Sequence, residues 1–531
     1  MKRIVLSILF PLLVACGQEN PDPGTEQKVP VLVSTEPADG ISNLEGTTLS
    51  VRFNFDMPVA CPDGERSRIS VGTAKIEQVF APGTYVSIEM TSLKAGESYT
   101  LTVPAGCIVN KNKPELCAKE LTFRFSMKKE EEKPEEPYGK LDGIATKLAL
   151  GWNLGNQMDA FYNGTWAGDK FLYPEETVWG NGKCTQALFD ALKNAGFSSV
   201  RIPVTWLKMI GPAPDYKIDE TWLGRVAEIA GYAHNAGLNA IVNTHHDEDH
   251  CLVDGKDRGW HTWLNVKDAA NDPVLNAQIK EEIAAVWGQT ATKFKDAGDW
   301  LIFESFNEIN DGGWGWSEEF RASPSKQCNV LNEWNQAFVN AVRAAGGHNE
   351  DRWLGVPGYC AGIDFLDYFR LPDDPAGRTM LAVHFYDPFD YASGAKYTEW
   401  GHTADTGKKA PNGDESNVEE KFNKLYRKYV SRGVPVYIGE YGCVNRANEH
   451  DRAFQRYYME YVTRAARFYG LPCFLWDNGA YEGDGENFGY FRHTDGAYIG
   501  EAESVVKLMV KAMYDPDNKY TLKSIYDNAP R

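Results

Sequence analysis

The chain of 531 residues lacks the features of several common protein classes. Acidic residues outnumber basic ones by 74 to 55, which gives a formal net charge of −19 at pH 7. Because no basic stripe is available to neutralise phosphates, nucleic acid is not an expected partner. Beyond the first 16 residues, no apolar run is long enough for a transmembrane helix. With 43% hydrophobic and 24% charged residues, the composition is that of a soluble globular protein.

Cysteine is scarce as well. Ten cysteines are spread along the chain without any Cys-x-x-Cys pair, so a zinc site is not expected. Nine remain when Cys16 is set aside, and an odd number cannot all pair within one chain. Cys61, Cys107 and Cys117 lie close together in sequence, so one disulfide among them is an expectation for an oxidising compartment.

The first 16 residues have the pattern of a targeting segment. Lys2 and Arg3 precede an apolar run over 4–13, which is too short to span a membrane. The sequence Leu-Val-Ala-Cys-Gly at 13–17 resembles a bacterial lipobox. The resemblance implies cleavage before Cys16 and a lipid on its thiol, and it predicts a protein anchored in the outer membrane of the cell envelope and exposed at the cell surface. An ordinary signal peptide with an incidental cysteine is the alternative.

Composition divides the remainder into a tether (17–29), a β-rich block (30–127), a linker (128–137) and a large C-terminal region (138–531). In the β-rich block, segments 49–55, 99–103 and 121–125 alternate polar and apolar residues, and turn residues separate them. About 100 residues of this kind predict a small all-β sandwich, which resembles a bacterial immunoglobulin-like module. We expect this module to act as a spacer rather than to bind a ligand.

The region 138–531 repeats an apolar run followed by a segment of helical period eight times. The apolar runs end near Asn153, Val204, Thr244, Phe306, Val356, Phe385, Ile438 and Trp476. Many of the helical segments stop at a glycine, a usual helix end. Eight such units in about 375 residues predict an α/β fold of the (β/α)8 TIM-barrel type. A doubly wound open sheet is the alternative, but no Gly-x-Gly-x-x-Gly motif opens the first unit.

Two glutamates follow predicted strands on opposite sides of this barrel. Glu308 comes directly after the fourth strand, and Glu440 comes after the seventh. Because the catalytic groups of TIM barrels lie at the C-terminal ends of strands, the two carboxylates are expected to share one mouth. Retaining glycosidases need such a pair about 5–5.5 Å apart, one residue as acid/base and one as nucleophile. The alternative is that both are salt-bridge partners at strand ends.

Further polar and aromatic residues are predicted to surround the pair. These candidates for support and substrate binding are Asn156, Arg201, His245, His246, Asn307, His384, Tyr386 and Trp476. Of the two adjacent histidines, either is a candidate for the position nearer the pair.

An Arg and a Tyr beside Glu440 would keep it ionised, as a nucleophile requires. Asn307 is positioned to hydrogen-bond a sugar 2-hydroxyl. Glu308 must begin protonated, so burial and the neighbouring carboxylate are expected to raise its pKa. Glu304 lies deeper on the fourth strand and is interpreted as structural.

The run His245-His246-Asp247-Glu248-Asp249-His250 is rich in potential metal ligands. It departs from the His-x-His-x-Asp-His run of binuclear zinc hydrolases, because Asp247 occupies the second histidine position. That metal fold is a layered sandwich rather than an eightfold repeat, so we expect neither a metal nor another cofactor. Asp247, Glu248 and Asp249 are instead predicted to begin a loop that faces the substrate.

Tryptophans gather in loop-like segments of the barrel region. They are Trp166, Trp179, Trp260, Trp263, Trp314, Trp316 and Trp400. A flat indole face packs well on the C–H faces of pyranose rings, so several of them are expected to line a sugar cleft. A large aromatic core is the alternative interpretation.

The barrel region as a whole resembles glycoside hydrolase family 5, in particular its subfamily 4. The likeness rests on residues 150–159, Arg201-Ile202-Pro203-Val204, Asn243-Thr244-His245-His246, Asn307-Glu308, His384-Phe385-Tyr386, Glu440 and Leu475-Trp476-Asp477-Asn478. It implies that Glu308 is the acid/base, that Glu440 is the nucleophile, and that the other candidates support them. Subfamily 4 enzymes act internally on β-1,4-glucans, mixed-linkage glucan and xyloglucan.

The resemblance therefore predicts a retaining endo-β-glucanase whose partner is a polysaccharide. A β-mannanase on the same barrel and a non-catalytic, surface glycan-binding lipoprotein are the alternatives, and the intact pair of glutamates disfavours the second. Substrate choice is expected to depend on the loops 157–183, 247–270, 310–329 and 387–417.

Overall fold

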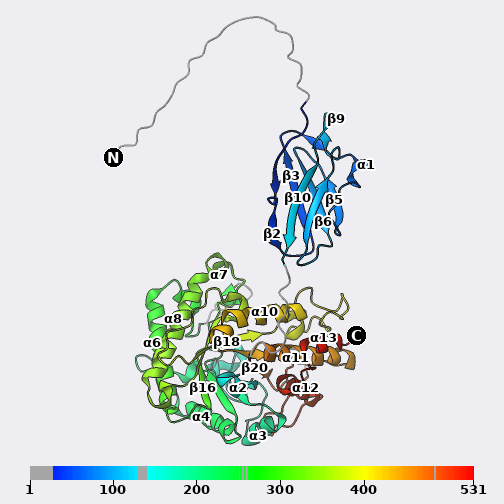
Figure 1. Cartoon of the computed structure of the whole chain (residues 1–531). Helices are drawn as coiled ribbons and strands as arrows, with labels where there is room; N and C mark the ends of the chain where they lie inside the picture. The colour runs from blue at the N-terminus through cyan, green and yellow to red at the C-terminus, as the bar shows by residue number, and fades with distance from the viewer. Residues whose placement is uncertain (1–27, 129–139, 250–251, 254–255, 258–260, 483–485) are drawn as a thin grey trace, which may run out of the picture. The chain divides into compact units, whose positions relative to one another are not determined.

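The computed structural model of the chain describes residues 28–128, 140–249, 252–253, 256–257, 261–482 and 486–531 (Figure 1). These residues belong to two compact units, one within 1–133 and the other within 134–531. The expected leader with its lipobox at Cys16, most of the tether and most of the linker lie outside the described residues. Among the described residues, no helix is both long and apolar enough to cross a bilayer.

The N-terminal unit is a sandwich of mainly antiparallel strands, as the alternating segments predict. One sheet has the order β1 (Leu32–Glu36), β3 (Leu49–Phe55), β6 (Tyr85–Thr91) and β5 (Lys75–Phe80). A second has the order β2 (Ile41–Leu44), β10 (Leu121–Met127) and β7 (Ser98–Val103), with β2 parallel to β10. A third contains β4 (Val59–Ala60), β8 (Val109–Asn110) and β9 (Lys113–Cys117), and the short helix α1 covers Asp63–Arg66.

Alternate residues of the sandwich strands form its core. Phe53 of β3 and Phe123 of β10 are fully buried, with ring centroids 6.3 Å apart, so the sheets meet through these side chains. The expectation of a disulfide here is wrong, because Cys61, Cys107 and Cys117 are all free. Cys61 and Cys107 are instead buried in the core as small apolar side chains, whereas Cys117 is exposed.

The C-terminal unit is the predicted TIM barrel, so the open-sheet alternative is excluded. Its ring of parallel strands is β11 (Leu150–Leu154), β12 (Ser199–Ile202), β13 (Asn239–Asn243), β16 (Leu301–Glu304), β17 (Leu354–Gly362), β18 (Thr379–Phe385), β19 (Val436–Tyr441) and β20 (Cys473–Asp477). Pairing of β11 with β20 closes the ring. A small hairpin, β14 (Leu252–Val253) and β15 (Lys256–Asp257), lies in the loop after β13.

Helices surround this ring (Figure 1). They are α2 (Gly143–Leu148), α3 (Gln186–Ala195), α4 (Glu220–Asn235), α5 (Val266–Ala269), α6 (Pro273–Lys293), α7 (Glu318–Ala322), α8 (Pro324–Ala344), α9 (Phe389–Ala392), α10 (Glu415–Lys428), α11 (Glu449–Phe468), α12 (Ala502–Tyr514) and α13 (Leu522–Asp527). Short 3-10 turns cover Thr165–Lys170, Leu207–Met209, Gly347–Glu350, Ile363–Phe365 and Val430–Arg432. Acidic or amide side chains cap several of the long helices: Asp219, Asp272, Asp414 and Asn448.

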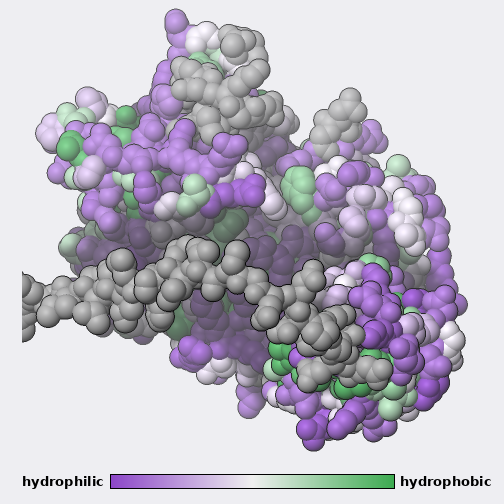
Figure 2. Space-filling view, turned by 90° about the horizontal axis from the view of Figure 1, so that it is seen from above, coloured by the Kyte–Doolittle hydropathy of each residue, from purple (hydrophilic) through white to green (hydrophobic). Residues whose placement is uncertain are grey.

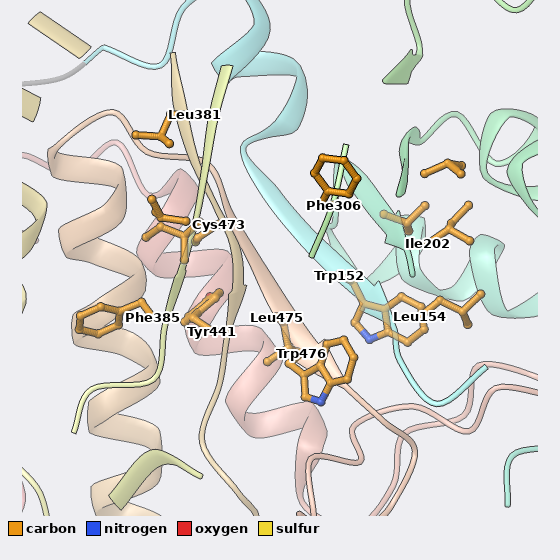
Figure 3. Close-up of a cluster of buried hydrophobic side chains, with 14 of the residues drawn as sticks. Trp152, Leu154, Ile202, Phe306, Leu381, Phe385, Tyr441, Cys473, Leu475 and Trp476 are labelled. Carbon is orange, nitrogen blue, oxygen red and sulfur yellow. The ribbon is translucent and has the colours of Figure 1, made fainter. Parts of the chain in front are cut away.

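The strands have two differently filled faces. Outward-facing residues such as Trp152, Ile202 and Leu475 belong to the large apolar cluster between the ring and the helices (Figure 3). Inward-facing residues near the strand starts form a second apolar cluster that includes Ile241 and Ile302. Because side chains alternate along a strand, the next inward positions lie two residues further on, at the C-terminal mouth.

Those next inward positions are polar. They are Asn153, Arg201, Asn243, Glu304 and His384, each two residues beyond a residue in the lower part of the barrel interior. In the layer below these residues, position 151 must be glycine, because a Cβ on Gly151 would lie 2.1 Å from the Phe474 ring. The barrel therefore has an apolar base and a polar upper layer, and that layer is the foundation of the candidate site.

Candidate active site

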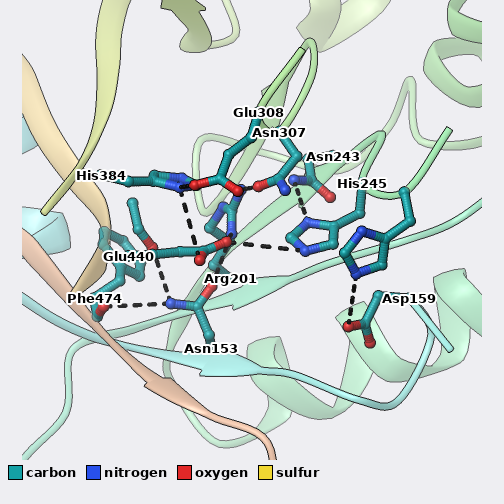
Figure 4. Close-up of polar contacts among 12 residues, drawn as sticks. Asn153, Asp159, Arg201, Asn243, His245, Asn307, Glu308, His384, Glu440 and Phe474 are labelled. Carbon is teal, nitrogen blue, oxygen red and sulfur yellow. Dashed lines mark hydrogen bonds and ion pairs between the residues drawn. The ribbon is translucent and has the colours of Figure 1, made fainter. Parts of the chain in front are cut away.

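Arg201 of β12 is the centre of the polar layer (Figure 4). Its Nε and Nη2 donate to Oε1 of Glu304 at 3.0 and 2.6 Å. Its Nη1 donates to Oε1 of Glu440 at 2.7 Å and to Oδ1 of Asn153 at 3.0 Å. Its Nη2 also donates to Oδ1 of Asn307 at 2.8 Å. One fully buried guanidinium thus balances two buried carboxylates and orients two amides.

Glu304 of β16 holds Arg201 from below. The Tyr437 hydroxyl donates to its Oε2 at 2.5 Å, and Nδ2 of Asn243 donates to its Oε1 at 2.9 Å. Burial alone would raise the pKa of Glu304, but the Arg201 charge holds that pKa below its usual range. A Cβ on Gly355 would lie 2.1 Å from the Tyr437 hydroxyl oxygen, so β17 leaves room for this contact. These contacts agree with the structural interpretation of Glu304.

Glu308 and Glu440 face each other across the mouth, with His384 beside both. Nδ1 of His384 lies 2.7 Å from Oε1 of Glu308 and 3.7 Å from Oε2 of Glu440. An oxygen of one glutamate lies within 4.8 Å of an oxygen of the other. Such a separation fits the carboxylate pair of retaining glycosidases, about 5–5.5 Å, rather than the wider pair of inverting ones. The Tyr386 hydroxyl donates to Oε2 of Glu440 at 3.1 Å.

The surroundings of the two glutamates differ. Burial and the charge of Glu248 raise the pKa of Glu308 to about 8, so this group holds a proton at neutral pH. The carboxylates that contribute most to this rise are Glu248 and then Glu486, rather than the Glu440 named by the sequence prediction. Burial also raises the pKa of Glu440, but Arg201 opposes that rise through a direct ion pair. The proton of the pair therefore resides on Glu308.

His384 is itself neutral at neutral pH. Burial lowers its pKa to about 4, so its ring supplies hydrogen-bonding capacity to Glu308 without adding a positive charge.

His245 lies closer to the pair than His246 does. Its Nε2 is 3.9 Å from Oε1 of Glu440, and its Nδ1 is 3.2 Å from Nδ2 of Asn243. Burial lowers the pKa of His245 well below its usual value, so the ring is neutral. It stacks parallel to the Trp476 indole, with centroids 5.8 Å apart and 5° between the planes. Two parallel aromatic rings therefore lie beside the nucleophile candidate.

His246 belongs to the rim of the mouth. Its Nε2 lies 3.8 Å from Oδ2 of Asp159, and its Nδ1 lies 3.7 Å from Oε1 of Glu248. Burial alone would lower the pKa of His246, but these two carboxylates raise it to about 9, so the ring is charged. Trp179 and Phe161 pack against it, with the Trp179 centroid 5.5 Å away.

Asn156 lies in the turn after β11, with a backbone φ of +53°. Its backbone N–H donates to Oδ2 of Asp159 at 3.0 Å, and its carbonyl accepts from Nδ2 of Asn181 at 3.1 Å. Gly155 allows this turn to approach the Trp476 ring, because a Cβ there would lie 2.8 Å from the indole. The described contacts of Asn156 thus shape the turn beside Trp476.

Asp247 and Asp249, two of the three acidic residues predicted to begin a substrate-facing loop, are buried against neighbouring loops instead. Asp247 is fully buried and accepts hydrogen bonds from the backbone N–H groups of Trp206 and Leu207 and from Nε1 of Trp263. Asp249 is also buried and lies 2.8 Å from Nδ1 of His261. These carboxylates satisfy donors of neighbouring loops, which is a structural task. Within the described residues, two groups could offer three ligand atoms to a metal: Asp159, His245 and His246, and Glu308, His384 and Glu440.

The loop tryptophans differ in exposure and in contacts. The prediction is wrong for Trp400, which is 1% exposed, packs against Tyr457 and Tyr458, and donates to the Gly413 carbonyl. Trp263 is tied to Asp247, and Trp179 lies on the rim beside His246. Trp314 and Trp316 are exposed. Trp260 and the side chain of Trp166 lie outside the described residues.

Several residues of the site escaped the sequence prediction. Asn153, Asn243, Tyr437 and Asp159 all contact a residue of the polar layer or of the predicted site. Glu248 was predicted only to begin a substrate-facing loop, but it raises the pKa of Glu308. Asn153 and Asn243 carry a recognisable signal, since each is a polar residue at an inward position two residues beyond a small or apolar one. Glu248 carries none, because its influence depends on how the loop after β13 folds.

Comparison with known protein families agrees with this geometry. Residues 163–482 match the family described as "Cellulase (glycosyl hydrolase family 5)", and residues 26–127 match the bacterial Ig-like domain. The chain belongs to glycoside hydrolase family 5. Endoglucanase A of Paenibacillus barcinonensis is 36% identical to this family 5 chain over 353 residues, which are 63% of this chain and 82% of the relative.

Solved structures of family 5 proteins superpose on the barrel. A broad specificity endoglucanase of subfamily 4 from Bacteroides salanitronis is 48% identical with a TM-score of 0.65, covering 72% of this chain and 98% of its own. A Bacteroidetes-affiliated family 5 cellulase linked with a polysaccharide utilization locus is 44% identical with a TM-score of 0.68, covering 73% and 97%. The predicted family and the TIM-barrel fold are therefore confirmed.

Replacing the central arginine of this family 5 protein tests the polar layer. We expect Arg201→Lys to lower the free energy of unfolding by about 2 kcal/mol or more, because lysine keeps the charge but loses the fork of charge-assisted hydrogen bonds. Glycoside hydrolysis should fall by at least about a hundredfold, since Glu440 and Asn307 both lose their orientation. Thermal unfolding and steady-state kinetics measure the two effects.

The matched control is Arg343→Lys. Arg343 also forms a two-pronged ion pair, with Asp374 at 2.8 Å, but on α8. The Arg343→Lys variant should be less stable than the wild type but keep the wild-type kcat. Wild-type stability and wild-type rate in Arg201→Lys would contradict the central role of this arginine.

Proposed function

We propose that this chain is a retaining endo-β-glucanase that hydrolyses internal β-1,4 linkages of glucan-type polysaccharides. The observation that carries the proposal is the facing pair of glutamates, within 4.8 Å of each other, of which Glu308 holds the proton. The similarity to endoglucanases along most of the barrel supports it. The intact pair argues against a purely sugar-binding protein.

The reaction proceeds in two steps. In the first, Glu440 attacks the anomeric carbon while Glu308 gives its proton to the leaving oxygen, so the glycosidic bond breaks and a glycosyl-enzyme ester forms. In the second, the Glu308 carboxylate takes a proton from water, whose oxygen attacks the anomeric carbon and releases Glu440. Two inversions at one carbon retain its configuration.

The supporting residues have separate tasks in this scheme. Arg201 and Tyr386 aim the Glu440 carboxylate through bonds of 2.7 and 3.1 Å. His384 fixes Glu308 at 2.7 Å. Because Oδ1 of Asn307 accepts from Arg201, its Nδ2 is directed as the donor for a sugar 2-hydroxyl, a contact that strengthens in the transition state. The Trp476 indole, which stacks parallel to the His245 ring, offers a flat face for the sugar that Glu440 holds.

For the substrate we propose unbranched β-1,4-glucan, mixed-linkage glucan and xyloglucan. The similar protein from Bacteroides salanitronis is described as having broad specificity, which supports this range of glucans.

Digestion of a polysaccharide panel tests the function. With carboxymethyl cellulose, mixed-linkage glucan, xyloglucan and β-mannan, we expect viscosity to fall early and products of intermediate length to appear from the glucans. The first product should carry the β configuration by NMR. Glu440→Gln should lower kcat by at least about a thousandfold, because no nucleophile remains.

Glu333→Gln is the control, since Glu333 pairs with Lys280 on the outer helices at 2.7 Å. It should keep wild-type turnover. Absence of cleavage of any β-glucan by the wild type would sink the proposed function, and full activity of Glu440→Gln would sink the mechanism alone.

The dependence on pH tests the proton assignment. Glu308 has a pKa raised to about 8 and must be protonated to act as an acid, so kcat/KM on β-glucan should be retained below that pKa and lost as pH rises through about 8. In Glu308→Gln, kcat/KM should fall by about 10²–10⁴ on β-glucan, yet stay near wild type on a dinitrophenyl cellobioside, whose leaving group needs no proton. A basic limb near pH 5 in the wild type would contradict the assignment.

For the location, we propose a lipid anchor on Cys16 that holds the enzyme in the outer membrane at the cell surface. The support is the lipobox-like sequence at 13–17. Radiolabelled palmitate should enter the wild type and the Cys117→Ser control, which lacks only an exposed thiol, but not Cys16→Ser. External protease should remove the wild type from intact cells. Membrane retention of an unlabelled Cys16→Ser protein would refute the anchor.

A further inference from the structure

Trp316 is the most exposed large hydrophobic side chain of the described residues, at 78%. The molecular face in Figure 2 is mainly hydrophilic, with hydrophobic residues in small scattered groups. Leaving an indole in water forgoes about 1.5–3 kcal/mol that burial of a large apolar side chain would contribute. Single exposed apolar residues are common on protein surfaces, so the exposure of Trp316 gains meaning from its place in the loop that follows Glu308 at the barrel mouth.

The loop that carries Trp316 is rigidly built. It runs from Glu308 to α7, and the Asp311 carboxylate organises it by accepting from the Gly313 N–H at 2.9 Å, the Ser317 hydroxyl at 2.6 Å and Nε2 of Gln327 at 3.1 Å. The Trp316 N–H closes the turn by donating to the Gly313 carbonyl at 2.7 Å. Since its backbone is already ordered, Trp316 loses little conformational entropy when a ligand binds.

Glycine packing fixes the direction of the turn. Gly315 has a φ of +83°, and a Cβ there would lie 2.2 Å from the ring of Phe365. That ring is held in turn by Phe320 and Tyr359, with centroids 5.3 and 5.6 Å away. The glycine next to Trp316 thus anchors the turn to the protein while the indole remains in solvent.

The position of the loop defines which half of the substrate it meets. β16 and β20 are the fourth and eighth strands of the closed ring, so they lie across the barrel from each other. Trp476 lies near the end of β20, on the side where the sugar joins Glu440, whereas the Trp316 loop continues directly from Glu308. Glu308 protonates the oxygen of the departing chain, so that chain leaves toward the Trp316 side.

We propose that Trp316 is a sugar-stacking platform for the leaving-group half of the glucan chain, on the far side of the cleaved bond from Trp476. The proposal rests on the proposed function. It names a β-linked gluco-oligosaccharide as the ligand, because the C–H faces of its pyranose rings are flat and apolar enough to cover an indole. The same platform would bind acceptor sugars during transglycosylation, since they enter by the same side.

Two substrates distinguish a role on the leaving-group side from a general effect on activity. Mixed-linkage glucan has sugars on both sides of the cleaved bond, whereas an aryl β-cellotrioside has only a small phenol on the leaving side. Trp316→Ala should lower kcat/KM on the glucan by about tenfold, which corresponds to about 1.4 kcal/mol, and change kcat/KM on the aryl trioside by less than about twofold. Transglycosylation from the aryl donor to cellobiose should fall in parallel.

Trp316→Phe should recover most of the lost rate, because a flat ring remains. Phe80→Ala is the matched control, since Phe80 is 53% exposed in the N-terminal unit, and it should change neither substrate. Because Trp316 is exposed, the thermal midpoint of Trp316→Ala should equal that of the wild type. An equal loss on both substrates, or no loss on either, would overturn the platform, whereas a wild type inactive on every β-glucan would overturn the proposed function instead.

Discussion

The site depends on one buried guanidinium between two buried carboxylates. Taking three charges into a barrel interior is expensive, and it is tolerated only when the charges are paired and their remaining hydrogen-bonding positions are filled. Arg201 meets that condition with Glu304, Glu440, Asn153 and Asn307. One carboxylate is locked from below by Tyr437, so the arginine has a fixed base from which to aim the other. Glu308 stands outside this ion network and keeps its proton, and this asymmetry turns two chemically identical side chains into an acid and a nucleophile.

The barrel supplies this network through a simple alternation. Each contributing strand places an apolar or small residue inward near its start and a polar one two positions later, so the polar groups collect at one end. The apolar base also matters for the chemistry. It excludes water below Arg201, and in such surroundings an ion pair holds its geometry more strongly than it would in solvent. The same alternation of side chains thus builds both the apolar base of the barrel and the polar layer of the site.

Much of this was readable from the sequence. The ring order, the strand ends and the glutamates Glu308 and Glu440 follow from periodicity, because period-two and helical segments are local properties of the chain. What failed depended on loop conformation or on distant contacts. Asp247 seemed free to face a ligand, but it caps backbone groups of a loop about 40 residues away. Trp400 lay in a loop-like segment and is nevertheless core. Cys61 and Cys107 are near in sequence but serve as packing residues. Glu248 acts on Glu308 through space, and spacing along the chain carries no sign of it.

The closed ring determines where substitutions are tolerated. Every barrel strand pairs with two neighbours, so the hydrogen-bonded frame and the ion network are insensitive to what happens in the connections above them. The turn after Glu308 is organised around Asp311 and packs on Phe365 and Tyr359. Its exposed residues can therefore be exchanged at small cost in stability. Mutational tolerance is thus concentrated in the connections, and constraint is concentrated in the ring that holds the ion network.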